Sequence, residues 1–265
     1  MQREETVNKI ISELSLSNGV NRARFPSKKK VRELVRKIQI FMFEGPFEAE
    51  FAETEMQRKL AFDIYDLLLE QLNSICSQPE AEGLSAEIME LLPEIKNKLL
   101  KDAIAIYEGD PAATSKEEVI LSYPGFYAIS VYRLAHEFYL RKIALIPRIM
   151  TELAHEKTGI DIHPGASIGE SFCIDHGTGV VIGETAVIGN NVKIYQGVTL
   201  GAKSFQLGED GNPIKGVKRH PRIGNNCIIY AGATILGGNT VIGDGCVIGG
   251  NVRLTHSVPP KQSVY

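Results

Sequence analysis

Cysteine is scarce in this sequence, which has 4 in 265 residues. The four lie far apart and form no CxxC pair, so the spacing needed for a structural zinc site or for thiol exchange is missing. We interpret them as free, mostly buried thiols that pack as small core residues, and we predict no metal site. They are Cys76, Cys173, Cys227 and Cys246.

Long apolar runs and an excess of positive charge are missing too. No segment approaches the roughly 18 uninterrupted apolar residues that a membrane span requires, and the N-terminal MQREETVNKI lacks the apolar core of a secretory signal. The net charge of −3 and the pI near 6.1 give no broad attraction for nucleic acid or anionic lipid. We therefore expect a cytoplasmic protein with no nucleic-acid or membrane partner.

The first part of the chain, residues 1–158, has the hydrophobic spacing of helices. Apolar residues recur at intervals of three and four, as at Met56, Leu60, Ile64 and Leu67. Proline and glycine interrupt the pattern, which predicts about six or seven helices, the last from about Leu145 to Lys157. The interruptions are Gly45-Pro46, Gln78-Pro79, Gly109-Asp110-Pro111 and Tyr123-Pro124-Gly125.

The second part, residues 159–265, has an aliphatic residue at every sixth position, a period that neither an amphipathic helix nor an alternating strand produces. Three hexads close one triangular coil, with the aliphatic side chain pointing inward and a small residue after it. We predict an α+β protein in which an all-helical domain (1–158) precedes a left-handed parallel β-helix (159–265). The fourteen aliphatic positions are Ile162, Ile168, Ile174, Val180, Ile182, Ile188, Ile194, Leu200, Ile223, Ile229, Ile235, Ile242, Ile248 and Leu254.

The hexad repeat is interrupted at three places. It shifts by two residues after Val180 and by one residue within LGGNTVIG (236–243), where we predict a local bulge. Between Leu200 and Ile223 a long polar segment that contains glycine replaces the hexads. We interpret this segment as a loop extruded from a coil corner, and loops of this length in a compact domain are commonly functional.

Seven motifs stand out from residue 109 onward: GDPAA (109–113), YPGFYAISVYRLAH (123–136), DIHPGASIG (161–169), IDHGTGVVIGETAVIG (174–189), VTLGA (198–202), RHPRIG (219–224) and YAGATILG (230–237). Together they resemble the serine acetyltransferases of the hexapeptide-repeat superfamily. The residues before GDPAA are similar to that family's helical domain only in character and length. The resemblance implies an enzyme of cysteine biosynthesis that transfers acetyl from acetyl-CoA to the hydroxyl of L-serine.

The hydroxyl of serine is a weak nucleophile, so its attack on a thioester carbonyl needs a base with a pKa near neutrality. Histidine meets that requirement. The resemblance implies that His176 is the base and that Asp161 accepts a hydrogen bond from its other ring nitrogen, which fixes the tautomer. The two residues are fifteen positions apart. Because a coil of three hexads has about eighteen residues, we expect them near each other on successive coils.

Serine is a zwitterion, and a selective site offers anions to its ammonium group and a cation to its carboxylate. The resemblance places Asp110 and Asp175 at the amino group, and Arg219 and His220 at the carboxylate. Asp110 also has a structural interpretation, because an aspartate before Pro111 is a good N-cap for a helix. Both roles remain open from the sequence.

For the co-substrate acetyl-CoA, the resemblance implies contacts with Gly201, Ala202 and Ala231 in a groove between two solenoids. Small side chains there let the pantetheine arm approach the backbone, although they also suit ordinary packing at coil corners. A groove between solenoids requires more than one chain, so we expect a homotrimer, or the dimer of trimers that the family forms through its helical domains.

Two further expectations concern regulation and partners. L-Cysteine has the ammonium and carboxylate groups of serine, so the resemblance implies that it inhibits at the same site. After VPP the sequence ends with KQSVY (261–265) and lacks the isoleucine-ending tail with which the family binds cysteine synthase. We expect no complex of that kind.

Three other interpretations stay open. Another hexapeptide acetyltransferase would act on homoserine or on an amino sugar, and a sugar has no carboxylate for Arg219 to bind. A metal-dependent hydrolyase would use His163, His176 and His220 as ligands, although we favour a structural role for His163. A noncatalytic trimeric scaffold is the third, because fold alone does not specify function.

Overall fold

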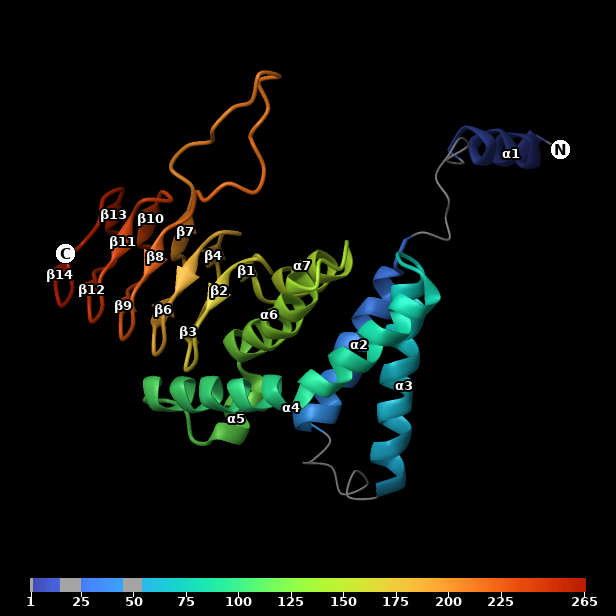
Figure 1. The fold of residues 1–265 in the computed structure, drawn as a ribbon, viewed down its shortest axis with the longest axis horizontal. Helices are drawn as coiled ribbons and strands as arrows, with labels where there is room; N and C mark the ends of the chain where they lie inside the picture. The colour runs from blue at the N-terminus through green and yellow to red at the C-terminus, as the bar shows by residue number, and fades with distance from the viewer. Residues whose placement is uncertain (1, 15–24, 45–53) are drawn as a thin grey trace.

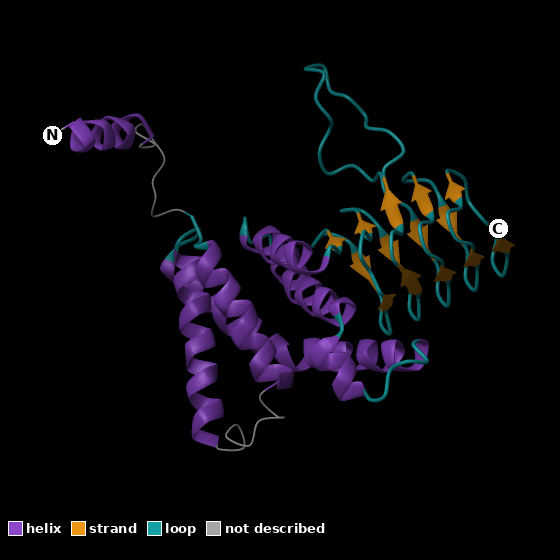
Figure 2. Cartoon of the chain, turned by 180° about the vertical axis from the view of Figure 1, so that it is seen from behind, coloured by secondary structure: helices purple, strands orange, loops and turns teal. Residues whose placement is uncertain are grey.

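The computed structural model describes residues 2–14, 25–44 and 54–265. Helices occupy the first part of the described chain and short parallel strands occupy the second (Figures 1 and 2). No described helix is both long enough and apolar enough to cross a membrane. The helices are α1 (Gln2–Leu14), α2 (Lys28–Gln39), the π-helical turn η2 (Ile40–Glu44), α3 (Thr54–Asn73), α4 (Gln78–Gly109), α5 (Lys116–Ser122), α6 (Pro124–Leu140) and α7 (Ile146–Thr158).

The helix boundaries follow the residues that interrupt the apolar pattern. Helix α4 begins at Gln78 and ends at Gly109, and α6 begins at Pro124, as the sequence predicted. The predicted final helix is α7, which ends where Gly159 adopts a left-handed φ of 70°. The predicted break at Gly45-Pro46 lies outside the described residues.

The strands form three parallel sheets that wrap into a β-helix of five coils, which confirms the predicted solenoid (Figure 1). Their orders are β1-β4-β7-β10-β13, β11-β8-β5-β2 and β14-β12-β9-β6-β3. Thirteen of the fourteen hexad positions are buried, and Ile168 is partly buried against the core. The strands are β1 (Asp161–Ile162), β2 (Ser167–Ile168), β3 (Cys173–Asp175), β4 (Val181–Ile182), β5 (Val187–Ile188), β6 (Lys193–Tyr195), β7 (Thr199–Gly201), β8 (Arg222–Ile223), β9 (Ile228–Ile229), β10 (Thr234–Leu236), β11 (Val241–Ile242), β12 (Val247–Ile248), β13 (Arg253–Leu254) and β14 (Ser263–Val264).

The length of a coil varies only at its corners. Twenty residues separate Asp161 from Val181, its partner on the next coil, whereas eighteen separate Val181 from Thr199. The two extra residues lie in the corner 176–180, where the sequence showed a phase shift. The segment 202–221 projects from the coil as the predicted extruded loop (Figure 1). Each interruption of the hexads is therefore accommodated without breaking a ladder of strands.

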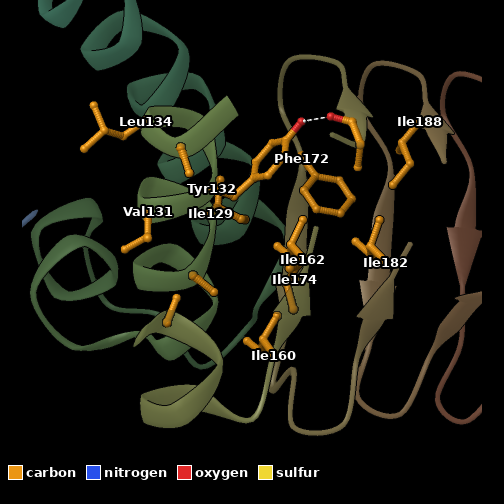
Figure 3. Close-up of a cluster of buried hydrophobic side chains, with 14 of the residues drawn as sticks. Ile129, Val131, Tyr132, Leu134, Ile160, Ile162, Phe172, Ile174, Ile182 and Ile188 are labelled. Atoms are coloured by element: carbon orange, nitrogen blue, oxygen red, sulfur yellow. Dashed lines mark hydrogen bonds between the residues drawn. The ribbon is translucent and has the colours of Figure 1, made fainter. Parts of the chain in front are cut away.

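The helical part packs directly onto the first coil of the β-helix. The α6 residues Ile129 and Tyr132 lie beside Phe172 and Ile174, and all four side chains are buried (Figure 3). The Tyr132 hydroxyl donates to the carbonyl of Ala166 at 2.5 Å, which satisfies the polar end of a buried ring. This contact fixes the position of α6 on the coil that carries the predicted catalytic residues.

A buried ion pair joins two helices to the same coil. Arg133 of α6 donates from Nη2 to Oδ1 of Asp102 on α4 at 2.8 Å and from Nε to Oδ2 at 2.5 Å. Asp102 also accepts the backbone N–H of Phe172 at 2.8 Å, and Arg133 donates to the carbonyl of Gly169 at 2.7 Å. Because both charges are paired and hydrogen-bonded, the pair orients α4 and α6 on the β-helix.

The four cysteines are free thiols, as predicted. Cys173, Cys227 and Cys246 are buried in the β-helix, and Cys76 is half-buried in the helical part. Burial raises the pKa of Cys173 to about 12, so its thiol stays protonated and is a poor nucleophile near neutral pH.

Candidate active site

The predicted site residues gather at two of the three corners of the β-helix. The His176 corner joins the third sheet to the first and contains residues 176–180, 196–198 and 230–233. The Arg219 corner joins the first sheet to the second and contains residues 163–166, 183–186 and 202–221. Each corner holds a different part of the predicted constellation.

His176 follows β3 directly and turns the chain into its corner. Its φ of 57° is uncommon for a residue with a side chain, and Gly177 and Gly179 continue the turn with φ of 87° and 81°. The side chain is 71% exposed, and its Nε2 lies 3.6 Å from Oδ1 of Asp175. Within the described chain no hydrogen bond holds the imidazole, so both ring nitrogens are accessible to a substrate or to a second chain.

Two carboxylates lie beside His176. Asp175 ends β3 with its side chain only 11% exposed, and its Oδ2 is 3.1 Å from Nζ of Lys193. Asp110 accepts a hydrogen bond from the Tyr123 hydroxyl at 2.7 Å, and this bond is the main reason that the pKa of Asp110 lies below its ordinary value. The positive charge of Lys193 lowers the same pKa further. The structure thus brings Asp110, Asp175 and His176 together, with Asp110 held as a carboxylate.

The alternative role of Asp110 as a helix N-cap is wrong. Asp110 follows the last residue of α4, and its Oδ1 accepts the backbone N–H of Ala112 at 2.9 Å in a local turn. The next helix, α5, is capped by Ser115, whose hydroxyl accepts the N–H of Glu118 at 3.1 Å. The sequence Asp-Pro is therefore used as a turn after a helix, and the second carboxylate oxygen, Oδ2, is the one that accepts the Tyr123 hydroxyl.

The Arg219 corner contains an ion pair that the sequence analysis did not foresee. Nη2 of Arg219 lies 2.6 Å from Oε2 of Glu184, and the Tyr139 hydroxyl donates to Oε1 of Glu184 at 3.1 Å. Both charged side chains are about a quarter exposed or less. Nη1 of Arg219 also donates to the carbonyl of Val217 at 3.4 Å, so Arg219 is positioned at the corner while part of its five-donor guanidinium stays available to a ligand.

The structure defines the protonation state and tautomer of His220. Its Nδ1 lies 3.0 Å from the backbone N–H of Thr185, which donates to it, and 2.9 Å from the Thr185 hydroxyl. Burial, together with the charge of Arg219, lowers the pKa of His220 to about 4. His220 is therefore neutral near pH 7 and carries its proton on Nε2, so it can donate a hydrogen bond but supplies no positive charge.

Asp161 and His176 are not paired within one chain. In the described residues the charged contact of Asp161 is with Arg148 of α7, whose Nη1 is 3.7 Å from Oδ1. The expectation that the two lie near each other on successive coils gains no support from a described contact, since the register places Val181, and not His176, next to Asp161. A coil of eighteen residues would place residue 179 next to Asp161, and the two extra residues of the corner 176–180 move His176 two positions further from the partner of Asp161.

The small residues predicted to contact acetyl-CoA divide between the two corners as well. Gly201 ends β7 and Ala202 follows it at the Arg219 corner, whereas Ala231 lies in the His176 corner. Next to Ala231, the rings of Tyr195 and Tyr230 stack with centroids 5.1 Å apart. Within one chain these residues therefore lie at opposite ends of the strands in the first sheet.

The three histidines of the hydrolyase alternative do not converge within one chain either. His163 lies at the Arg219 corner, where its Nδ1 accepts the backbone N–H of Gly165 at 3.0 Å and its ring packs edge-on against Tyr139. Burial lowers the pKa of His163, as suits a neutral structural residue. His176 lies at the other corner. The structure therefore gives this alternative no support from a single chain.

Sequence reasoning missed four residues that shape the two corners. Lys193 and Tyr123 contact the carboxylates at the His176 corner, and Glu184 and Thr185 position Arg219 and His220. Glu184 and Thr185 stand between two hexads, in the same corner from which the loop is extruded. Aligning the hexads of successive coils places Glu184 and Thr185 beside the loop that carries Arg219 and His220. This alignment is the sequence signal that could have identified them.

Comparison with known proteins identifies relatives of this arrangement. The family profile described as "Serine acetyltransferase, N-terminal" matches residues 48–131. The chain is 57% identical over 186 residues to "Serine acetyltransferase, plasmid" of Synechococcus elongatus, a match that covers 70% of this chain but 58% of that relative. It is 46% identical over 168 residues to the serine acetyltransferase of Bacillus subtilis, covering 63% of this chain and 73% of the relative.

A solved structure matches almost the whole chain. The crystal structure of Entamoeba histolytica serine acetyltransferase 1 in complex with L-cysteine superposes with a TM-score of 0.81 at 36% identity. The match covers 98% of this chain and 97% of that one. Because both the sequence and the two-part fold agree over these lengths, the chain belongs to the serine acetyltransferase family of hexapeptide-repeat proteins.

Proposed function

We propose that this chain is a serine O-acetyltransferase, which transfers the acetyl group of acetyl-CoA to the hydroxyl of L-serine and releases CoA and O-acetyl-L-serine. The observation that carries the proposal is the exposed imidazole of His176 beside the carboxylates of Asp110 and Asp175. A base adjacent to two anions suits an acceptor in which a hydroxyl stands next to an ammonium group. We propose further that residues 159–265 carry the transfer, while residues 1–158 supply Asp110.

In this reaction His176 acts first as base and then as acid. It takes the proton of the serine hydroxyl as the oxygen attacks the thioester carbonyl, and the carbonyl π electrons move to oxygen. When the tetrahedral intermediate collapses, the C–S bond breaks and the imidazolium returns its proton to the CoA sulfur. The exposure of the ring supports this role, because no hydrogen bond in the described chain occupies either nitrogen.

The two charged groups of serine each bind to side chains of complementary charge or hydrogen-bonding character. Its ammonium lies between Asp110 and Asp175, and its carboxylate accepts hydrogen bonds from Arg219 and from Nε2–H of His220. Arg219 alone supplies the cation, since His220 is neutral. Neutral His220 still contributes to specificity. Its buried Nε2–H would lack a hydrogen-bond acceptor if the bound molecule had no carboxylate, and an unsatisfied buried donor costs free energy.

The site is completed between chains of a homotrimer. Within one chain the anionic part lies at the His176 corner and the cationic part at the Arg219 corner, so neither corner alone can bind a zwitterion. When three solenoids pack side by side, the His176 corner of one faces the Arg219 corner of the next. The same contact brings the carboxylate of Asp161 on one chain toward the imidazole of another, which supplies the orienting partner that is missing within a single chain. Two such trimers then associate through their helical domains.

Acetyl-CoA binds along the groove between two chains. Gly201 and Ala202 from one chain and Ala231 from the next form its walls, which agrees with their location at different corners. Small side chains on both walls admit the pantetheine arm close to the backbone. The co-substrate requires no metal ion.

The same pocket binds L-cysteine as a feedback inhibitor. Cysteine keeps the ammonium and carboxylate of serine, and the matching Entamoeba histolytica structure was determined with L-cysteine. An enzyme inhibited in this way belongs to cysteine biosynthesis, and we place it in the cytoplasm, where acetyl-CoA is available to it.

The test is release of CoA thiol from acetyl-CoA with L-serine, L-homoserine or glucosamine as the acceptor. We expect L-serine to be the preferred acceptor and His176→Ala to lower kcat by about 10²- to 10⁴-fold, the usual contribution of a general base. His256→Ala replaces an exposed histidine on the last coil and should match the wild type. A preference for another acceptor, or full activity in His176→Ala, would refute the proposal.

A further inference from the structure

Lys193 is a mostly buried cation whose role the sequence left unassigned. It begins β6, its side chain is 17% exposed, and its Nζ contacts groups from both halves of the chain. Nζ donates to the carbonyl of Gly109 at 2.6 Å and lies 3.1 Å from Oδ2 of Asp175. It also lies 4.5 Å from the centroid of the Tyr195 ring, a cation–π contact.

These contacts connect the two carboxylates of the His176 corner. Gly109 is the last residue of α4 and directly precedes Asp110, and Asp175 is the last residue of β3. The packing around Gly109 is close, since a Cβ there would be 3.5 Å from Nζ of Lys193 and 3.4 Å from Sγ of Cys173. One ammonium group therefore holds the end of a helix and the end of a strand at a fixed separation.

The charge of Lys193 also changes what the corner attracts. Asp110 and Asp175 together carry two negative charges. With the positive charge of Lys193, these three side chains have a net charge of −1. A single ammonium group then neutralises the corner. Burial alone would lower the pKa of Lys193, but its contacts with Tyr195 and Asp175 outweigh burial and raise it, so the side chain stays charged.

We propose that Lys193 is a positioning and specificity residue for the amino group of the acceptor: it fixes the spacing of Asp110 and Asp175 and matches their charge to one ammonium. This inference rests on the proposed function for the identity of the acceptor. Lys193 does not touch the reacting atoms, so its loss should weaken binding of serine and leave the chemical step almost unchanged.

The experiment compares Lys193→Met with a matched control. Lys101→Met removes another lysine that joins the helical part to the β-helix, where Nζ of Lys101 is 2.7 Å from Glu170 at a different corner. For Lys193→Met we expect the KM for L-serine to rise about tenfold or more, with kcat within about threefold and the KM for acetyl-CoA unchanged. Lys101→Met should leave all three constants within about twofold of the wild type.

Two further readouts separate positioning from a general structural effect. Lys193→Arg keeps the charge and the donors and should restore the KM for L-serine to within about threefold, whereas Lys193→Gln should not. Lys193 is one of the groups that lower the pKa of Asp110. In Lys193→Gln the acid limb of the serine KM profile should therefore move to higher pH, and the arginine and glutamine variants decide the question if Lys193→Met does not fold.

Calorimetric titration with L-serine keeps this inference distinct from the proposed function. If the wild type binds L-serine but transfers no acetyl group, the proposed function fails, and the ratio of dissociation constants still tests Lys193. If Lys193→Met or Lys193→Gln binds L-serine as tightly as Lys101→Met does, or if the KM for acetyl-CoA rises in parallel, the role of Lys193 is overturned. Absence of L-serine binding to the wild type would overturn both.

Discussion

His220 should make the folded protein lose stability in acid, and His220→Asn should abolish that loss. The Nδ1 of His220 accepts from the backbone N–H of Thr185 at 3.0 Å, and the side chain is 7% exposed. Protonation of Nδ1 replaces this acceptor with a second donor and buries a charge next to Arg219. Asparagine is the appropriate substitution, since its Oδ1 can accept the same N–H and does not titrate near neutral pH.

The magnitude follows from the pKa, which falls from an ordinary 6.5 to about 4 in the folded protein. Between these pH values the unfolded chain binds a proton at His220 and the folded chain does not. The free energy of unfolding therefore falls as the pH is lowered from 6.5 toward 4, and this contribution is fully present above pH 6.5. The shift corresponds to about 3 kcal/mol at 1.36 kcal/mol per pH unit.

The assay is unfolding in guanidinium chloride at several pH values between 7.5 and about 4, at one protein concentration for both proteins. Carboxylates titrate in both, so the informative quantity is the difference between wild type and His220→Asn. We expect that difference to change by about 3 kcal/mol across the range, with the wild type losing more stability. Parallel curves would show that His220 titrates normally, and the neutral tautomer assigned to it would then be incorrect.

Two further predictions concern the packing of the helices on the first coil. Arg133→Met leaves the buried carboxylate of Asp102 without its partner and should cost about 3–5 kcal/mol of unfolding free energy in guanidinium chloride; a loss below about 1 kcal/mol would mean that the pair contributes little. Gly125→Ala places a Cβ in collision with the carbonyl oxygen of Ile174, so α6 must move off β3 and the melting temperature should fall by several degrees. Gly83→Ala is the control, because no atom lies within 4 Å of its Cβ in α4, and it should match or exceed the wild type in the same melting experiment.

The β-helix was predictable because its signal is local and repeated. Each coil needs an aliphatic residue at the same inward positions. Ile162 and Ile182 therefore predict two neighbouring strands regardless of the residues between them, and the structure pairs the two residues directly. The helical part gave less information, since amphipathic spacing identifies helices but not how they pack. The buried pair of Asp102 and Arg133 shows this difference, because two charged residues in helical segments look exposed until the segments meet.

The candidate site was predictable in its residue types and not in its arrangement. The family resemblance identified Asp161 and His176 as site residues. Their relative position depends on the number of residues in the corner 176–180, which the spacing of the two residues in the sequence does not reveal. From the sequence Lys193 looks like an ordinary outward residue of a strand, but in the structure its ammonium group donates to the carbonyl of Gly109, 84 residues earlier. A contact between residues so far apart in the chain leaves no periodic pattern in a single sequence, so it could not be predicted.

The extruded loop shows how this architecture accommodates new material. Segment 202–221 leaves the solenoid after β7 and returns at β8, yet both strands pair with the coils on either side as though nothing intervened. An insertion within a rung would displace every later isoleucine from the interior, whereas an insertion at a bend displaces none. Such a scaffold can acquire or lose a recognition surface at its edges while its interior stays in register, so evolutionary change in specificity need not cost the protein its folding.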